Sequence, residues 1–189
     1  MNLDRKELLE IIRDYSLQIG EFVLSSGKKS SYYLDCRVTT LHPRGALLSA
    51  RLLLDMIRKH AIDAEAIGGL TLGADPVVTA VAVVSAMGGK PLPAFIVRKE
   101  KKEHGMQRQI EGWRGAPGSR VIIADDVCTS GGSLMEACQA AESVGYEVAA
   151  TMCIVDRLDA GADQLKKRYP FYSLFTVEDL LPEGTSRPV

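Results

Sequence analysis

The spacing of apolar side chains predicts a helix, two short strands and a second helix in the first third of the chain. Apolar residues within 3–16 fall on one helical stripe. Two strand-like segments follow at residues 20–24 and 31–35, joined by a turn-forming stretch of Ser, Gly and Lys. Pro43 suits the first turn of a helix, and the leucines behind it indicate a helix that runs to about His60.

From residue 64 onward, apolar strands alternate with helices. The expected strands cover residues 64–69, 92–98, 119–127 and 147–157, and the expected helices cover 74–88 and 133–145. Buried strands separated by helices form a parallel sheet with helices on both faces. We therefore expect an α/β fold with a central parallel sheet flanked by helices, in one domain of 189 residues.

Residues 99–118 interrupt this alternation. The stretch holds four glycines, one proline and a dense mixture of charges. A gap of that length between two core strands is typical of a lid or of a disordered segment. Trp113 within this stretch is a packing anchor more readily than a ligand contact.

Composition excludes several classes of partner. The net charge of −1 gives no overall attraction to nucleic acid or to an anionic membrane, so an anionic ligand needs a local cluster of donors. The N-terminus is charged and amphipathic, and no apolar run approaches the length of a membrane span, so we expect no membrane association. The cysteines lack metal-ligand spacing and indicate a reduced, cytoplasmic chain; they are Cys36, Cys128, Cys138 and Cys153.

The strongest chemical signal is the segment VIIADDVCTSGGS at residues 121–133. A hydrophobic strand ends in Asp125 and Asp126, and a turn of Thr, Ser and Gly then opens a helix. In an open parallel sheet, ligands bind beyond the carboxyl ends of the strands. Turn amides, hydroxyls and a helix N-terminus form a cradle for a phosphate, and adjacent carboxylates suit the two hydroxyls of a ribose. The segment predicts a clamp for ribose 5-phosphate.

The alternative interpretation of this segment is an acidic strand end before an ordinary helix, with Ser130 or Ser133 as its N-cap. A lone Gly-rich turn would merit that interpretation, but the full unit of residues 121–133 does not. The segment contains neither a Gly-Lys-Ser/Thr phosphate loop nor a GxGxxG fingerprint.

The same segment resembles the phosphoribosyl-pyrophosphate signature of the type I phosphoribosyltransferases. Three further segments narrow the resemblance to the orotate enzymes: FVLSSGKKSSYYLD at 22–35, RKEKKEHG at 98–105 and VDR at 155–157. The resemblance implies the type I phosphoribosyltransferase fold, with an N-terminal helix and small hood in residues 1–40 and an α/β core in 41–189 that carries a mobile lid, 99–118. It implies transfer of the phosphoribosyl group of 5-phosphoribosyl 1-pyrophosphate (PRPP) to orotate, giving orotidylate for UMP synthesis.

The resemblance also assigns roles to individual residues. The catalytic set is Lys102, His104, Asp125 and Asp126; PRPP contacts come from Arg98, Lys99, Lys102, His104, Asp125, Asp126, Val127, Cys128, Thr129, Ser130, Gly131, Gly132 and Ser133; orotate contacts come from Thr129 and Arg157. Cys128 is interpreted as packing within the cradle and not as a nucleophile. Mg²⁺ is the expected cofactor, held mainly through the substrate and without a dedicated set of protein ligands.

The charged loop also makes chemical sense from its residues. Arg98, Lys99, Lys101 and Lys102 are four cations within five residues, and His104 follows them. A leaving pyrophosphate gains negative charge, and cations placed where charge develops accelerate the reaction by on the order of a hundredfold or more. The alternative, a solvated charged loop, is the better interpretation only when no phosphate cradle is present. By resemblance Lys102 meets the leaving pyrophosphate, and Lys101 is solvated.

Arg157 ends a strand at the expected carboxyl edge of the sheet. A guanidinium fork matches a planar anionic base. The alternative is a structural salt bridge with Asp156 or Asp159. Tyr33 either covers the base or joins Tyr32 as a core aromatic.

Two positions depart from the family pattern. Better-known orotate enzymes have lysines where this chain has Ser25 and Gly73, so neither lysine contact is carried over. Backbone amides near Gly73 are expected to replace the second, at the start of the helix. The resemblance further implies a cis peptide at Thr71–Leu72, and a homodimer in which the lid of one subunit reaches the site of its partner.

Two other functions are compatible with the phosphate cradle of residues 121–133. One is a type I phosphoribosyltransferase for a purine base, against which the hood segment, the charged loop and Arg157 argue. The other is a regulatory protein on the same fold that senses PRPP and binds RNA or DNA. Net charge near zero and the intact Lys102–His104 loop favour the enzyme without nucleic acid.

Overall fold

The computed structural model describes residues 3–23, 29–99 and 109–182. Its larger sheet has six strands in the order β5-β4-β3-β6-β7-β8. All neighbouring pairs are parallel except β4 and β5. The strands are β3 Ala66–Leu70, β4 Ala94–Val97, β5 Ile110–Gly112, β6 Arg120–Cys128, β7 Glu147–Asp156 and β8 Phe171–Thr176. The expected α/β fold with a mainly parallel sheet is confirmed.

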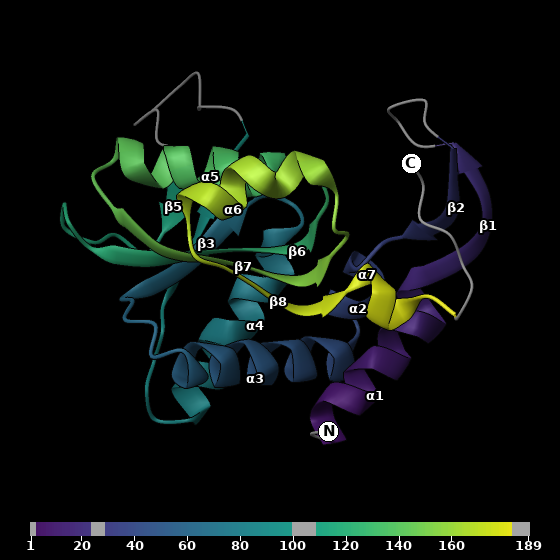
Figure 1. The fold of residues 1–189 in the computed structure, drawn as a ribbon. Helices are drawn as coiled ribbons and strands as arrows, with labels where there is room; N and C mark the ends of the chain where they lie inside the picture. The colour runs from purple at the N-terminus through teal and green to yellow at the C-terminus, as the bar shows by residue number, and fades with distance from the viewer. Residues whose placement is uncertain (1–2, 24–28, 100–108, 183–189) are drawn as a thin grey trace.

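Helices cover both faces of this sheet (Figure 1). One face is covered by α3 and α4, with α1 beyond them, and the other face by α5 and α6. Their bounds are α1 Leu3–Ile11, α3 Pro43–Lys59, α4 Ala74–Met87, α5 Gly132–Ser143 and α6 Asp163–Arg168. Single-turn or shorter helical segments fill the connections: η1 Ile12–Ser16, α2 Arg37–Thr40, η2 Ala160–Ala162 and α7 Val177–Leu180.

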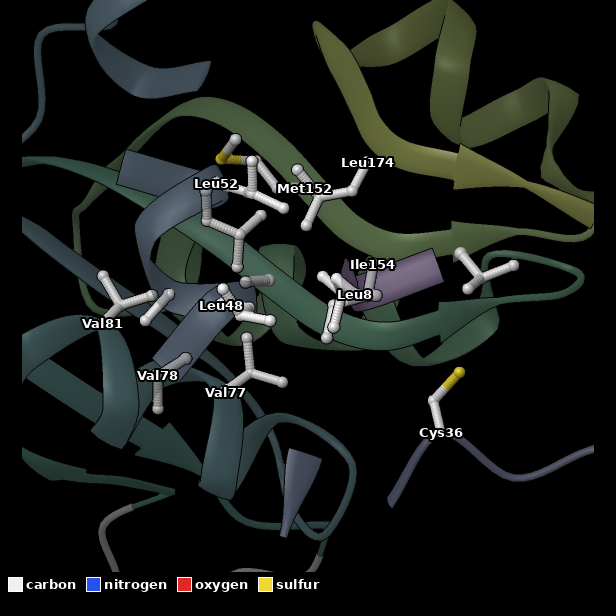
Figure 2. Packing of buried hydrophobic residues seen from close by; sticks show 14 of the residues in the cluster. Leu8, Cys36, Leu48, Leu52, Val77, Val78, Val81, Met152, Ile154 and Leu174 are labelled. Atoms are coloured by element: carbon white, nitrogen blue, oxygen red, sulfur yellow. The ribbon is translucent and has the colours of Figure 1, made fainter. Parts of the chain in front are cut away.

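The two faces form separate hydrophobic clusters because side chains alternate along a strand. In β6, Ile122 and Ala124 pack toward α3 and α4, whereas Val121 and Ile123 pack toward α5. Figure 2 shows the first cluster, in which side chains from α1, α3, α4, β7 and β8 meet. This packing makes β6 the central rigid support of the site described below.

A small hood stands beside the core (Figure 1). It is a two-stranded antiparallel sheet of β1 Leu17–Val23 and β2 Lys29–Leu34. Its inner residue Tyr32 is 2% exposed and packs with Val177 and Leu181 at the C-terminal helix α7. The hood is therefore attached to the core through a cluster of its own.

Most of the expected elements agree with the structure, and the differences lie at the ends of the chain and in its loops. The helix at the N-terminus continues beyond Ile11 only as a five-residue π-helical segment. The strand β8 and the short helices α2, α6 and α7 were not predicted. Residues 110–112, in the second half of the expected lid, form β5, an antiparallel edge strand on β4, and Trp113 packs beside Tyr146 with ring centroids 5.6 Å apart, as expected of a packing anchor.

Within the described part of the chain, no helix has the length and apolar character needed to cross a membrane.

Candidate active site

Four loops meet at the carboxyl edge of the parallel strands. They follow β3, β4, β6 and β7, and they carry Gly73, Arg98, Thr129 and Arg157 respectively. From β3 the chain continues to β4 on one side, and β6 and β7 lie on the other, so the order reverses between β3 and β6. Such a switch point is where open α/β sheets bind ligands.

The motif after β6 folds into a concave turn. A hollow of about 80 Å³ is lined by Asp125, residues 127–133 and Leu134. Gly131 has φ 76°, a left-handed conformation that side-chain-bearing residues adopt at a cost, and it immediately precedes α5. Ser130 and Ser133 are exposed at the mouth. The hollow therefore combines hydroxyls, turn amides and the N-terminus of a 12-residue helix, which is a suitable site for a phosphate.

The two carboxylates lie just before this turn and are bonded to their own backbone. Asp125 Oδ1 accepts the N–H of Asp126 at 2.9 Å, and Asp126 Oδ1 accepts the N–H of Val127 at 2.8 Å. Burial, reinforced by the neighbouring Asp126 charge, raises the pKa of Asp125 to about 8. Burial also raises the pKa of Asp126. The free site therefore retains a proton on the pair near neutral pH, and it favours ligands that supply hydrogen-bond donors or positive charge.

The loop after β3 approaches this pair closely. The Thr71–Leu72 peptide is cis, as the resemblance implied. A Cβ atom on Gly73 would lie 2.4 Å from Asp125 Oδ1 and 2.8 Å from Asp126 Oδ1, so only glycine fits without displacing a carboxylate. Gly73 thus lets the backbone at the start of α4 lie directly against the two carboxylates.

Arg157 is anchored at the end of β7 by its backbone. Its N–H donates to the carbonyl of Cys128 at 2.9 Å, which ties it to the first residue of the phosphate turn. The expected alternative partners are engaged elsewhere: Asp156 pairs with Lys166 at 2.7 Å, and Asp159 accepts the N–H of Gly161. The salt-bridge interpretation of Arg157 is therefore wrong for the residues that the structure describes.

The two hood tyrosines have different environments. Tyr32 is buried, and its hydroxyl accepts a hydrogen bond from Arg157 Nε at 3.1 Å. Tyr33 is 40% exposed and stands against Phe22 with ring centroids 5.8 Å apart. Tyr32 is thus a core aromatic with one polar contact, and Tyr33 is not in the core.

The charged segment begins beside the site. Arg98 and Lys99, with Thr71, Asp75, Ile96 and Glu111, line a cavity of about 530 Å³ next to the loop after β3. Arg98 Nη1 lies 3.9 Å from Glu111 Oε1, and Thr71 Oγ1 donates to Asp75 Oδ2 at 2.8 Å. Lys101, Lys102, His104 and Ser25 lie outside the described residues.

Two other chemistries have little support. Burial raises the pKa of the Cys128 thiol to about 12, so it stays protonated at neutral pH and is not an activated nucleophile. No group of three or more His, Cys, Asp or Glu side chains that could hold a metal ion occurs among the described residues. His42 acts structurally instead: its Nδ1 accepts the N–H of Gly45 at the start of α3.

Sequence reasoning did not identify the contact between Tyr32 and Arg157 or the approach of Gly73 to the carboxylates. Tyr32 and Arg157 are 125 positions apart, and a repeating pattern along one strand gives no sign of a partner at that distance. For Gly73 the sequence did contain a signal, because a glycine between a strand and a helix often permits a close approach of the backbone.

Comparison with known proteins was informative over nearly the whole chain. Residues 43–187 match the family of the phosphoribosyl transferase domain. An orotate phosphoribosyltransferase from Nostoc sp. is 44% identical over 177 residues, covering 93% of this chain and 84% of that protein. One from Rhodopirellula baltica is 42% identical over 183 residues, covering 94% of each.

Solved structures agree with these relatives. The orotate phosphoribosyltransferase of Mycobacterium tuberculosis in complex with Fe(III) dicitrate superposes with a TM-score of 0.82 and 40% identity, covering 94% of this chain and 98% of that one. Its complex with PRPP gives a TM-score of 0.76 at 36% identity with the same coverage. An adenine phosphoribosyltransferase from Leishmania tarentolae, 20% identical with a TM-score of 0.57, shares the fold alone.

Proposed function

The chain belongs to the orotate phosphoribosyltransferases of the phosphoribosyl transferase domain family, and from that membership we infer which of its residues hold each substrate. The reaction joins orotate to the ribose of PRPP, releases pyrophosphate and supplies orotidylate to pyrimidine biosynthesis. The proposals below concern the site residues, Mg²⁺, assembly and cellular location.

One observation supports the assignment of residues most strongly. The phosphate turn and Arg157 are joined by the hydrogen bond from the Arg157 N–H to the Cys128 carbonyl. A group that holds a phosphate and a group that reads an anionic base therefore lie on adjacent strands at one edge of the sheet. This arrangement suits a reaction in which orotate must approach the ribose of PRPP while the 5′-phosphate is held nearby.

We assign the 5′-phosphate of PRPP to residues 129–133 and the ribose hydroxyls to Asp125 and Asp126. Arg157 and Thr129 hold orotate. The ring nitrogen of orotate forms the new bond to C1 of the ribose and loses its proton to solvent or to the departing pyrophosphate. The C1–oxygen bond breaks, and its electron pair leaves with pyrophosphate. Arg98, Lys99, Lys102 and His104 supply positive charge and donors where that negative charge develops.

The residues present also fit Mg²⁺, which is readily held by one or two carboxylates together with substrate oxygens and water. Asp125 and Asp126 are the carboxylates that we assign to the ribose hydroxyls, and they lie just before the turn of residues 129–133. The cation would neutralise charge on the ribose and pyrophosphate oxygens of the donor. The role of Asp125 and Asp126 is to accept hydrogen bonds from the ribose hydroxyls, and the pair gives up its retained proton when those donors and the cation are in place.

We propose a homodimer whose lid is shared between subunits. Large apolar side chains are exposed around α2 and α4, including Leu41 at 72% and Met87 at 81%. Val38, Leu41, Leu72 and Ala80 line an apolar groove of about 850 Å³ there, beside the carboxylate-facing loop. Contiguous exposed apolar surface of this kind marks a protein interface. A partner on this face would lie next to the active site.

We also place the enzyme in the cytoplasm. All four cysteines are free and buried, which is the pattern of a chain that works under reducing conditions.

A comparison of bases tests the function. The kcat/KM with PRPP is measured for orotate, uracil, adenine and hypoxanthine as acceptors. We expect orotate to exceed the others by on the order of a hundredfold or more, because only orotate brings a carboxylate to Arg157. If a purine reacts with a kcat/KM equal to or higher than that of orotate, the protein is a purine phosphoribosyltransferase and the proposal is wrong.

A further inference from the structure

Arg157 has a fixed backbone but needs a separate support for its side chain. Its N–H is bonded to Cys128, and the next residue is held by the Asp156 carboxylate, whose Oδ1 accepts the Leu158 N–H at 2.9 Å. Lys166 in turn holds Asp156. These contacts leave the long side chain of Arg157 free to rotate.

Tyr32 supplies that support from the hood. Its hydroxyl accepts from Arg157 Nε at 3.1 Å, and its ring centroid lies 5.1 Å from the Arg157 Cζ atom. Tyr32 therefore contacts the guanidinium through both its hydroxyl and its ring. The ring contact is a cation–π interaction that attracts the group, and the hydroxyl bond fixes the direction of its Nε–H.

Tyr32 itself is held firmly. It is 2% exposed and packs with Val177 and Leu181, which belong to or follow α7. Its carbonyl oxygen accepts the hydroxyl of Ser30 at 2.6 Å, and its strand is paired with β1. A buried ring with these neighbours has little freedom to move, so it can hold the Arg157 side chain in one orientation.

We propose that Tyr32 is a positioning residue for orotate, which acts by presenting one edge of the Arg157 guanidinium to the base. An arginine has five N–H groups, and the Tyr32 hydroxyl takes the one on Nε. The outer edge, formed by Nη1 and Nη2, remains for a carboxylate, which it binds with two parallel hydrogen bonds. This inference rests on the proposed contact between Arg157 and orotate.

The test removes the hydroxyl and keeps the ring. In Tyr32→Phe we expect KM for orotate to rise about three- to tenfold, the usual effect of one lost hydrogen bond, with KM for PRPP unchanged. In the reverse reaction, KM for orotidylate should rise and KM for pyrophosphate should not. Equal changes for all substrates, together with a lower unfolding midpoint, would mean that the hydroxyl supports only the fold.

Tyr169→Phe is the matched control. Tyr169 is also a buried tyrosine, its hydroxyl donates to Glu142 Oε1 at 2.8 Å, and Arg168 Cζ lies 5.1 Å from its ring. It packs in the cluster with α5 and α6, and the partners of its hydroxyl and ring, Glu142 and Arg168, are not residues of the proposed site. This variant should lose one similar hydrogen bond without a selective change in KM for orotate.

A double-mutant cycle separates this inference from the proposed function. In the Arg157→Ala background, Tyr32→Phe should have no further effect on KM for orotate, because Tyr32 acts through Arg157. If Arg157→Ala raises that KM and Tyr32→Phe alone does not, or if the two effects multiply independently, the positioning role is wrong and the function of Arg157 stands. If Arg157→Ala leaves that KM unchanged, both fail.

Discussion

The chemistry of the site at the scale of single residues depends on two neighbouring carboxylates with raised pKa values. Asp125 is 6% exposed, and the hydrogen bond from the Asp126 N–H and the charge of Lys99 offset the cost of its burial only in part. Burial of the two carboxylates lowers the stability of the ligand-free protein, and a ligand that brings hydroxyl donors and Mg²⁺ would stabilise them. The site therefore favours binding at a cost in stability.

This cost makes stability depend on pH. Burial, then the Asp126 charge, raises the pKa of Asp125 from 3.8 to about 8, so the folded protein binds more protons than the unfolded chain between these values. The contribution of Asp125 to the free energy of unfolding therefore falls as pH rises from about 4 to about 8. Asp125→Asn should flatten this slope and be more stable than wild type at pH 8, by about 1 kcal/mol or more. Denaturant unfolding at pH 5 and pH 8 measures both, and an unchanged slope would contradict the assignment.

Arg157 gives the second prediction at this scale. Arg157→Ala should raise KM for orotate roughly ten- to a hundredfold, the usual effect of losing a charged hydrogen-bonding partner. KM for PRPP should change little, because the phosphate turn and Asp125 are intact. Steady-state kinetics with each substrate varied in turn will show this. Equal increases in both constants would mean that Arg157 supports the fold and does not contact the base.

At the scale of elements, the turn between β3 and α4 leaves no room for a side chain at Gly73 in this chain. A methyl group on Gly73 would collide with the oxygens of Asp125 and Asp126. Gly73→Ala should therefore displace the pair and raise KM for PRPP roughly tenfold or more, since small displacements at a reacting site have large effects.

Gly88→Ala at the other end of α4 is the control for Gly73→Ala. The added methyl group there would lie 3.5 Å from the Ser85 carbonyl oxygen, an ordinary contact. PRPP kinetics of this variant should match wild type. If both variants bind PRPP normally, the loop does not approach the carboxylates during catalysis as closely as in the structure.

The sequence predicted elements better than it predicted contacts between them. The core strands and helices were recognisable because apolar periodicity is a local property, and residues 121–133 carry their own turn and cap. β5 was not predicted because a strand of three residues after a charged, Gly-rich run is too short to show alternating apolar and polar positions. The partnership of Tyr32 with Arg157 depends on how the hood packs on α7, which no local pattern encodes.

At the scale of the whole molecule, a nearly neutral chain concentrates opposite charges at one edge of its sheet. The net charge is −1, yet Asp125 and Asp126 lie beside loops that begin with Arg98 and contain Arg157. Binding of anionic substrates thus depends on local geometry and not on the overall field. The exposed apolar face at α2 and α4 borders the same edge, which is why we connect assembly with catalysis.

Subunit mixing tests that connection. Lys102→Ala disables only the lid, and the double variant Asp125→Ala, Asp126→Ala disables only the cradle, so each alone should be nearly inactive. After equal mixing and exchange, about half the dimers are heterodimers, each with one site built from an intact lid and an intact cradle. Activity should recover to roughly a quarter of wild type. If mass measurement confirms exchange and activity stays at the single-variant level, the lid acts within its own chain.

The central claim is that one sheet edge joins PRPP to orotate, and the most direct measurement is PRPP-dependent loss of orotate absorbance. With Mg²⁺ present, we predict loss of orotate matched mole for mole by release of pyrophosphate, and little loss without Mg²⁺. The variant with Asp125→Ala and Asp126→Ala should be nearly inactive under the same conditions. If folded wild-type protein with PRPP and Mg²⁺ leaves orotate unchanged, or if that double variant retains full activity, the assignment of this site is contradicted.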